Sequence, residues 1–249
     1  MPLTLYDLRD IKDDDRECYI EGILYEGQIV LLIGTQKVGK SYLSAQWSVA
    51  LAAGADWGQG RLTIPKPRNV LYYQTEGTKF DLAERTNPIF EFYPAEGERW
   101  TGDVPEELDL STDVGIPTLI KMLKAEKIDV LFIDSLFSSM QGDINRSQDV
   151  SKVKATLNKI QGQCPNVAFV ILHHEHRPIR DPKAGGFVNE GAARYAGSYV
   201  LAAMADQFWL YTEEKNDERE RRRFETAYTR SRSQDIDPFY VTIDENGLL

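Results

Sequence analysis

The 249-residue sequence predicts an α/β domain built on a mainly parallel, doubly wound sheet with antiparallel strands toward the C-terminus. Strand-like and helix-like segments alternate along the chain, which is the order expected when helices connect parallel strands. Several strand-like segments are apolar at nearly every position, as in strands covered on both faces. A glycine-rich turn also joins the first such strand to a helix.

The first unit of this domain is a strand, a turn and a helix in direct succession. Residues 28–33 are apolar after the first position and are expected to form a buried strand. Residues 34–41 fit the pattern G-x-x-x-x-G-K-[ST], and apolar spacing predicts a helix over 41–53. We expect residues 1–27 to be a lead-in segment and residues 28–249 to form a single domain.

The later elements continue the alternation. Prolines mark the loop before residue 70, and Pro117 suits the first turn of a helix. In order, we expect a strand at 70–74, the start of a helix or a turn at 79–85, an acidic irregular surface segment at 100–114, a helix at 116–126, a strand at 128–134, an amphipathic helix at 150–161 and a strand at 167–172. Three further segments are expected as antiparallel strands, at 206–212, 222–230 and 239–244, with a hairpin turn at 215–217.

Composition excludes several classes of protein. The net charge of −10 argues against a generally basic protein that coats nucleic acid, so any such site would be a local basic patch. Cys18 and Cys164 lie far apart in the sequence and lack metal-ligand spacing, so they are most simply interpreted as reduced thiols. The N-terminus is too acidic for a signal peptide, and no apolar run could span a membrane. We therefore expect a cytoplasmic protein.

The glycine-rich turn predicts a P-loop that binds ATP and Mg²⁺. Its backbone N–H groups can converge on phosphate oxygens at the positive end of the following helix. Lys40 would neutralise the β- and γ-phosphates, and the Ser41 hydroxyl would hold Mg²⁺. The expected nucleotide contacts are Gly34, Thr35, Gln36, Lys37, Val38, Gly39, Lys40, Ser41 and Tyr42. An ordinary strand-to-helix loop is the alternative.

Polar side chains follow three of the expected strands where each one ends, at the sheet edge where α/β proteins bind ligands. Asp134 would bind Mg²⁺ opposite Ser41, and Glu76 would be the general base for the attacking water. A histidine would contact the γ-phosphate, with His174 preferred over His173. The alternatives are that Glu76 is a solvated loop residue and that the histidine has a structural role. Metal binding by "HHEHRP" is disfavoured, because no well-spaced fourth ligand accompanies these histidines.

This set of motifs resembles the RecA-like P-loop ATPases, nearest to the branch that holds hexameric replicative helicases of the RepA type and AAA_25-type proteins. The residues that carry the resemblance are "GTQKVGKSYLSAQWSVALAAG", "VLYYQTEG", "VLFIDSL", "VILHH" and "RYAGSYVLAAMADQFWLY". It covers roughly residues 15–235. The resemblance implies ATP hydrolysis at the subunit interfaces of a homo-oligomer, such as a hexameric ring, acting on single-stranded DNA with loader or primase proteins as further partners.

Two loops would face the central channel, at 138–149 and 176–198. The second loop carries four cations that would follow DNA phosphates: Arg177, Arg180, Lys183 and Arg194. Relatives often have Arg-Gly-Ser where this chain has Arg194-Tyr195-Ala196-Gly197-Ser198, so the sequence departs from the family pattern at this point. A flexible surface loop is the alternative.

The same resemblance suggests Arg230 and Arg232 as arginine fingers for a neighbour's nucleotide. We expect their strand near the sheet edge, where it cannot easily reach its own P-loop. Surface arginines on an edge strand are the alternative, and the charge run at 213–223 is expected to be a solvated hairpin.

The sequence as a whole predicts a homo-oligomeric, DNA-stimulated ATPase of the replicative-helicase type. A recombination mediator or KaiC-like regulator that does not translocate is the alternative, and the acidic net charge favours it somewhat. A small-molecule kinase is disfavoured, because nothing in the sequence resembles an acceptor lid.

Overall fold

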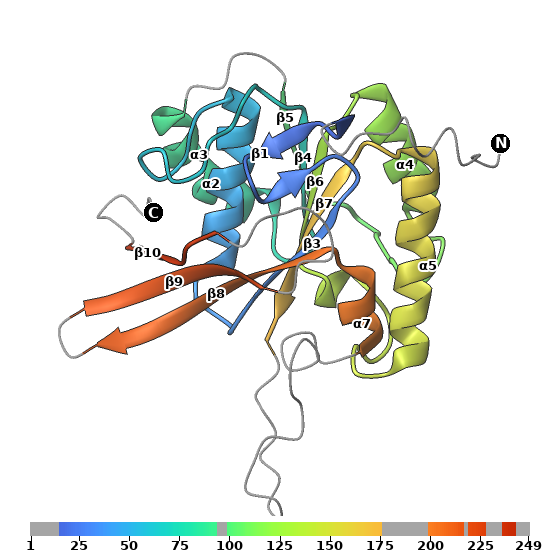
Figure 1. Cartoon of the computed structure of the whole chain (residues 1–249). Helices are drawn as coiled ribbons and strands as arrows, with labels where there is room; N and C mark the ends of the chain where they lie inside the picture. Colours follow the sequence, from blue (N-terminus) through green and yellow to red (C-terminus); the bar gives the residue numbers. More distant parts are fainter. Residues whose placement is uncertain (1–14, 94–98, 176–198, 217–218, 228–235, 243–249) are drawn as a thin grey trace, which may run out of the picture.

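The computed structural model describes residues 15–93, 99–175, 199–216, 219–227 and 236–242. Within these ranges, eight strands form one sheet in the order β10-β9-β8-β3-β7-β6-β4-β5 (Figure 1). The strands are β3 (Ile29–Gly34), β4 (Val70–Gln74), β5 (Trp100–Asp103), β6 (Val130–Asp134), β7 (Ala168–His174), β8 (Gln207–Asn216), β9 (Arg219–Ala227) and β10 (Phe239–Val241). The pairs from β8 across to β5 are parallel, and β9 and β10 are antiparallel to their neighbours. The predicted fold class is confirmed.

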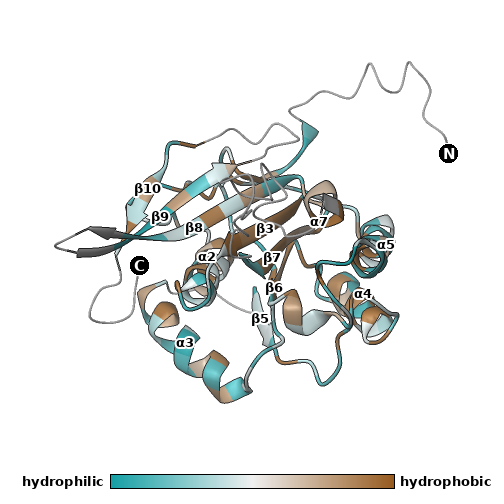
Figure 2. Ribbon diagram, turned by 90° about the horizontal axis from the view of Figure 1, so that it is seen from below, coloured by the Kyte–Doolittle hydropathy of each residue, from teal (hydrophilic) through white to brown (hydrophobic). Residues whose placement is uncertain are grey.

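Helices cover both faces of the sheet (Figure 2). They are α2 (Lys40–Ala53) and α3 (Lys79–Phe92) on one face, and α4 (Ile116–Ala125), α5 (Ser147–Gln163) and α7 (Tyr199–Met204) on the other. Strand alternation sends Val30 and Leu32 into the core under α2, and Leu31 and Ile33 into the core under α5. Both faces are therefore buried, which explains why these strands are apolar throughout.

A two-stranded hairpin, β1 (Cys18–Ile20) with β2 (Leu24–Tyr25), precedes the main sheet. Its apolar side chains join the core under α2, and the Tyr19 hydroxyl donates to the Asn166 carbonyl at 2.8 Å. Part of the expected lead-in segment is thus packed on the domain, and the boundary at residue 28 stays a prediction. No helix in the described ranges is long and apolar enough to cross a membrane.

One prediction about the last strands is wrong in detail. β8 is antiparallel to β9, as predicted, and it also runs parallel to β3, because the chain passes through α7 after β7 and so re-enters the sheet in the same direction. The hairpin turn does not include Lys215 and Asn216, because both are paired with β9. Long cross-strand pairing of opposite charges, such as Glu213 with Arg222, extends the hairpin beyond the sheet (Figure 1).

The segment predicted as irregular surface at 100–114 is also partly wrong. β5 adds an edge strand parallel to β4, where the Trp100 indole donates to Ser48 at 2.9 Å and stacks on Tyr72. Leu110 is fully buried. The segment at 79–85, predicted as the start of a helix or a turn, is the first part of α3, which begins with a capping box between Thr78 and Asp81 and runs to Phe92.

Candidate active site

The P-loop connects β3 to α2 in a tight turn that requires glycine. A Cβ on Gly34 would lie 2.1 Å from the Tyr211 carbonyl oxygen of β8 and 3.2 Å from Val38 Cγ1. Gly39 has a φ of 99°, and Lys37 also adopts a left-handed φ of 65°. The close approach of β8 therefore requires glycine at position 34, and the left-handed backbone of the loop favours glycine at position 39.

Lys40 is held inside the loop by main-chain oxygens. Its Nζ donates to the Gly34 and Thr35 carbonyls at 2.8 Å each and lies 3.2 Å from His174 Nδ1. The residue is only 5% exposed, and burial lowers the pKa of its amine to about 8, despite the opposing charges of nearby acids such as Asp134. Phosphate oxygens can replace these carbonyls as acceptors, as the prediction for Lys40 requires.

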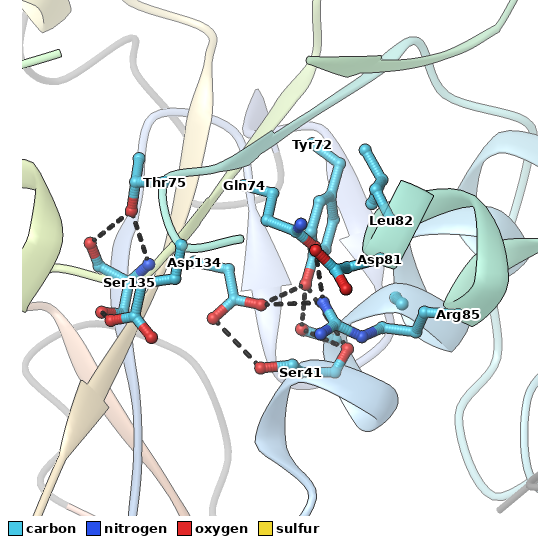
Figure 3. Close-up of polar contacts among 12 residues, drawn as sticks. Ser41, Tyr72, Gln74, Thr75, Asp81, Leu82, Arg85, Asp134 and Ser135 are labelled. Atoms are coloured by element: carbon cyan, nitrogen blue, oxygen red, sulfur yellow. Dashed lines mark hydrogen bonds and ion pairs between the residues drawn. The ribbon is translucent and has the colours of Figure 1, made fainter. Parts of the chain in front are cut away.

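Ser41 and Asp134 come together as expected for a metal site. The Ser41 hydroxyl donates to Asp134 Oδ1 at 3.1 Å, and the Tyr72 hydroxyl donates to Oδ2 at 2.9 Å (Figure 3). Hard oxygen ligands of this kind are those that Mg²⁺ prefers. A cavity of about 230 Å³ adjoins them and is lined also by Lys37, Gly39, Lys40, Tyr42, Glu76, Arg85, Ser135, Leu172 and His174. The residues present therefore fit Mg²⁺ held beside a phosphate chain.

Arg85 is a member of this site that the sequence analysis missed. From α3, its Nη1 donates to Gln74 Oε1 at 2.8 Å and lies 3.4 Å from Asp134 Oδ2 (Figure 3). Helical spacing could have revealed it, because Leu82 and Ile89 mark the buried face of α3 and Arg85 lies between them. A cation on that face requires an acidic partner.

Glu76 lies two residues beyond β4 and lines the same cavity. Its Oε1 accepts hydrogen bonds from Ser135 Oγ at 2.7 Å and Ser138 Oγ at 2.6 Å. Burial alone would raise the pKa of the carboxyl group, but these hydrogen bonds and the charges of His174 and Lys40 outweigh it, so the pKa is lowered. The side chain is therefore an anion near the expected position of the γ-phosphate.

The two histidines that end β7 differ in position. His174 lies against Lys40, and burial first, then that cation, lowers the pKa of its imidazole. His173 is only 2% exposed. Of the two, His174 is the one beside Lys40, and its preference as the γ-phosphate contact stays a prediction. In the described part of the chain, no group of three or more His, Cys, Asp or Glu side chains could hold a metal ion.

A larger cavity of about 1000 Å³ lies beside the P-loop. Glu76, His173 and His174 line it, together with Thr35, Gln36, Phe137, Glu175 and part of the predicted channel loop at 138–149: Ser138, Gly142, Asp143, Ile144 and Asn145. The other predicted DNA contacts, Arg177, Arg180, Lys183 and Arg194, lie outside the described residues, as do Arg230 and Arg232.

The expectation that the strand after the charged hairpin stays away from its own P-loop is wrong for the start of β9. Arg222 Nε donates to the Val38 carbonyl at 2.7 Å. β9 lies next to β8, which itself pairs with β3, so its first residues reach the phosphate side of the sheet. The strand then runs away from the P-loop, and its last residue, Ala227, pairs with Phe208 near the opposite end of the sheet.

Comparisons with known proteins agree with this arrangement. Residues 3–178 match the family model AAA_25, described as an AAA domain. A solved structure with a similar fold is the KaiC-like protein PH0186 from the hyperthermophilic archaeon Pyrococcus horikoshii OT3, with a TM-score of 0.61 and 18% identity over 92% of this chain and 91% of that chain. No curated protein gives a significant match.

Proposed function

This chain belongs to the AAA_25 family of AAA domains, and from that premise we propose that it hydrolyses Mg²⁺–ATP with Glu76 as the general base. The observation that carries the proposal is the convergence of four polar groups on one cavity. Lys40 and Ser41 come from the P-loop, Asp134 from the end of β6, and Glu76 from the segment after β4.

In this mechanism, the P-loop amides and Lys40 bind the phosphates and hold the γ-phosphate toward Glu76. Ser41 and Asp134 would hold Mg²⁺, which supplies positive charge to the phosphate oxygens when it is bound. Glu76 orients the attacking water and accepts its proton. His174 would contact the γ-phosphate, and its position 3.2 Å from Lys40 Nζ supports this role.

Two substitutions separate binding from chemistry. Glu76→Gln keeps the shape of the side chain and removes the base, so it should retain ATP binding and slow turnover by roughly 10²-fold or more. Lys40→Ala should abolish tight ATP binding and leave the fold intact, which circular dichroism would check. Turnover close to wild type in Glu76→Gln would assign the base to another acid, and nucleotide affinity within about threefold of wild type in Lys40→Ala would rule out the phosphate contact.

We further propose that the chain acts as a homo-oligomeric motor on single-stranded DNA. The cations at Arg177, Arg180 and Lys183 support this, together with the position of loop 138–149 beside the catalytic cavity. The second candidate is a KaiC-like regulator, which the name of the similar solved structure and the net charge of −10 favour. Strand displacement on forked DNA distinguishes the two, because only a helicase separates the strands.

Neutralising Arg177, Arg180 and Lys183 together tests the DNA contact directly. Single-strand binding should weaken, and its salt dependence should decrease by up to about three phosphate contacts. Basal ATP turnover should remain, since the P-loop is unchanged. If the wild-type protein does not bind single-stranded DNA at any salt concentration, the regulator is the better assignment.

A further inference from the structure

The carboxylate of Glu76 is restrained by two hydroxyl groups. Ser135 and Ser138 both donate to its Oε1, at 2.7 and 2.6 Å. Hydrogen bonds of this length to a charged oxygen are among the stronger ones in proteins. They stabilise the anion and therefore oppose the transfer of a water proton to it.

The two serines are held in the structure to very different degrees. Ser135 is 2% exposed, and its backbone N–H donates to Thr75 Oγ1 at 2.8 Å while its carbonyl accepts from Ser139 Oγ at 2.6 Å. Ser138 is exposed and belongs to the three-residue helix η2 (Phe137–Ser139). One donor is thus fixed by the sheet, and the other depends on the position of a short turn.

Ser138 also lies between two cavities. On one side is the cavity of about 1000 Å³ that contains Glu76 and His174, and on the other is a cavity of about 360 Å³ that includes Thr75 and Glu107. Phe137, next to it, is 65% exposed. Ser139, the last residue of η2, is buried, and its carbonyl accepts from the Leu110 N–H at 2.6 Å. The exposed Ser138 side chain, with space on both sides, can therefore rotate away from Glu76 while the backbone of η2 stays in place.

We propose that Ser138 is a positioning residue that withholds Glu76 from the attacking water, and that rotation of the Ser138 side chain away from the carboxylate releases it. The proposal rests on the proposed function, in which Glu76 is the base. Loss of the Ser138 bond leaves Glu76 with one donor and makes the carboxylate a better proton acceptor. The Ser138 hydroxyl group thereby limits the rate of hydrolysis.

The test measures ATP turnover without nucleic acid in Ser138→Ala and Ser138→Thr. Ser138→Ala should raise kcat by about three- to tenfold and change KM for ATP by less than about twofold, because the P-loop contacts are unaffected. Ser138→Thr keeps the hydroxyl and should behave as wild type. Ser151→Ala is a matched control, since Ser151 is an exposed serine on α5 that bonds only the Ser147 carbonyl among the contacts described.

The double variant Ser138→Ala/Glu76→Gln separates this proposal from the proposed function. If Ser138 acts through Glu76, the double variant should be as slow as Glu76→Gln alone. A kcat at or below the wild-type value in Ser138→Ala, with Glu76→Gln inactive, would overturn the role of Ser138 and leave the base in place. Wild-type turnover in Glu76→Gln would instead remove the proposed mechanism, and with it this one.

Discussion

Arg85 places a permanent positive charge 3.4 Å from Asp134, the carboxylate proposed to hold Mg²⁺. Part of the negative charge that would attract the ion is therefore already balanced. Arg85→Gln should lower the Mg²⁺ concentration needed for half-maximal nucleotide binding by about three- to tenfold. Titration of a fluorescent ATP analogue with Mg²⁺ would measure this shift. Arg85→Lys, which keeps the charge, is the control. An unchanged Mg²⁺ requirement in Arg85→Gln would show that Arg85 does not compete with Mg²⁺ for Asp134.

Lys40 gives the site a dependence on pH. Burial lowers the pKa of its amine to about 8 in the protein alone, whereas bound phosphates would keep it protonated. Binding therefore takes up a proton above this pKa, and ATP affinity should fall as pH rises past 8, by at most about tenfold per unit. Isothermal titration calorimetry at pH 7, 8 and 9 measures the trend. An equally steep fall in Lys40→Arg, whose guanidinium stays protonated from pH 7 to 9, would assign the effect to another group.

At the scale of elements, the β8–β9 hairpin is attached to the P-loop through one arginine. Arg222 Nε donates to the Val38 carbonyl, and a carbonyl held from outside helps to keep the adjacent amides directed toward the phosphates. Arg222→Ala should raise KM for ATP by roughly three- to thirtyfold, in line with the loss of a hydrogen bond from a charged group.

Steady-state kinetics of Arg222→Ala would be compared with those of Arg221→Ala. Arg221 is the preceding residue of β9, so its side chain points to the opposite face of the strand. The same rise in KM in both variants would indicate a general effect of removing positive charge from the hairpin. A loss in Arg222→Ala alone identifies the contact with the P-loop.

At the scale of the whole molecule, the proposed arginine fingers predict that the active site is completed by a second copy of the chain. Arg230→Ala or Arg232→Ala should leave ATP binding nearly intact and slow turnover by roughly 10²-fold or more. Mixing either variant with Lys40→Ala should restore some activity, because one interface can then combine an intact P-loop with an intact finger. Full turnover in both arginine variants would exclude the role in trans, as would undiminished activity of a wild-type monomer at high dilution.

The amino-acid sequence by itself determined the P-loop and the strand-end residues of the site. The P-loop is contiguous, so its glycines, Lys40 and Ser41 can be read from eight consecutive positions. Glu76, Asp134 and His174 were predictable for a different reason, because parallel strands bring their carboxyl ends to one edge of the sheet. Continuous apolar runs also predicted the buried strands.

Only the tertiary structure decided which side chains act on these residues. Arg85 reaches Asp134 across 49 positions, Ser138 reaches Glu76 across 62, and Arg222 reaches Val38 across 184. No local pattern links such residues, because the sequence around an exposed serine or arginine does not show which distant residue it contacts. The direction of β8 relative to β3 was also decided by the tertiary structure. It depends on how the chain crosses the sheet before β8, and the pattern of apolar residues within the strand does not reveal it. The sequence therefore specifies the residues of the proposed site, and the packing of distant elements specifies which side chains hold them in place.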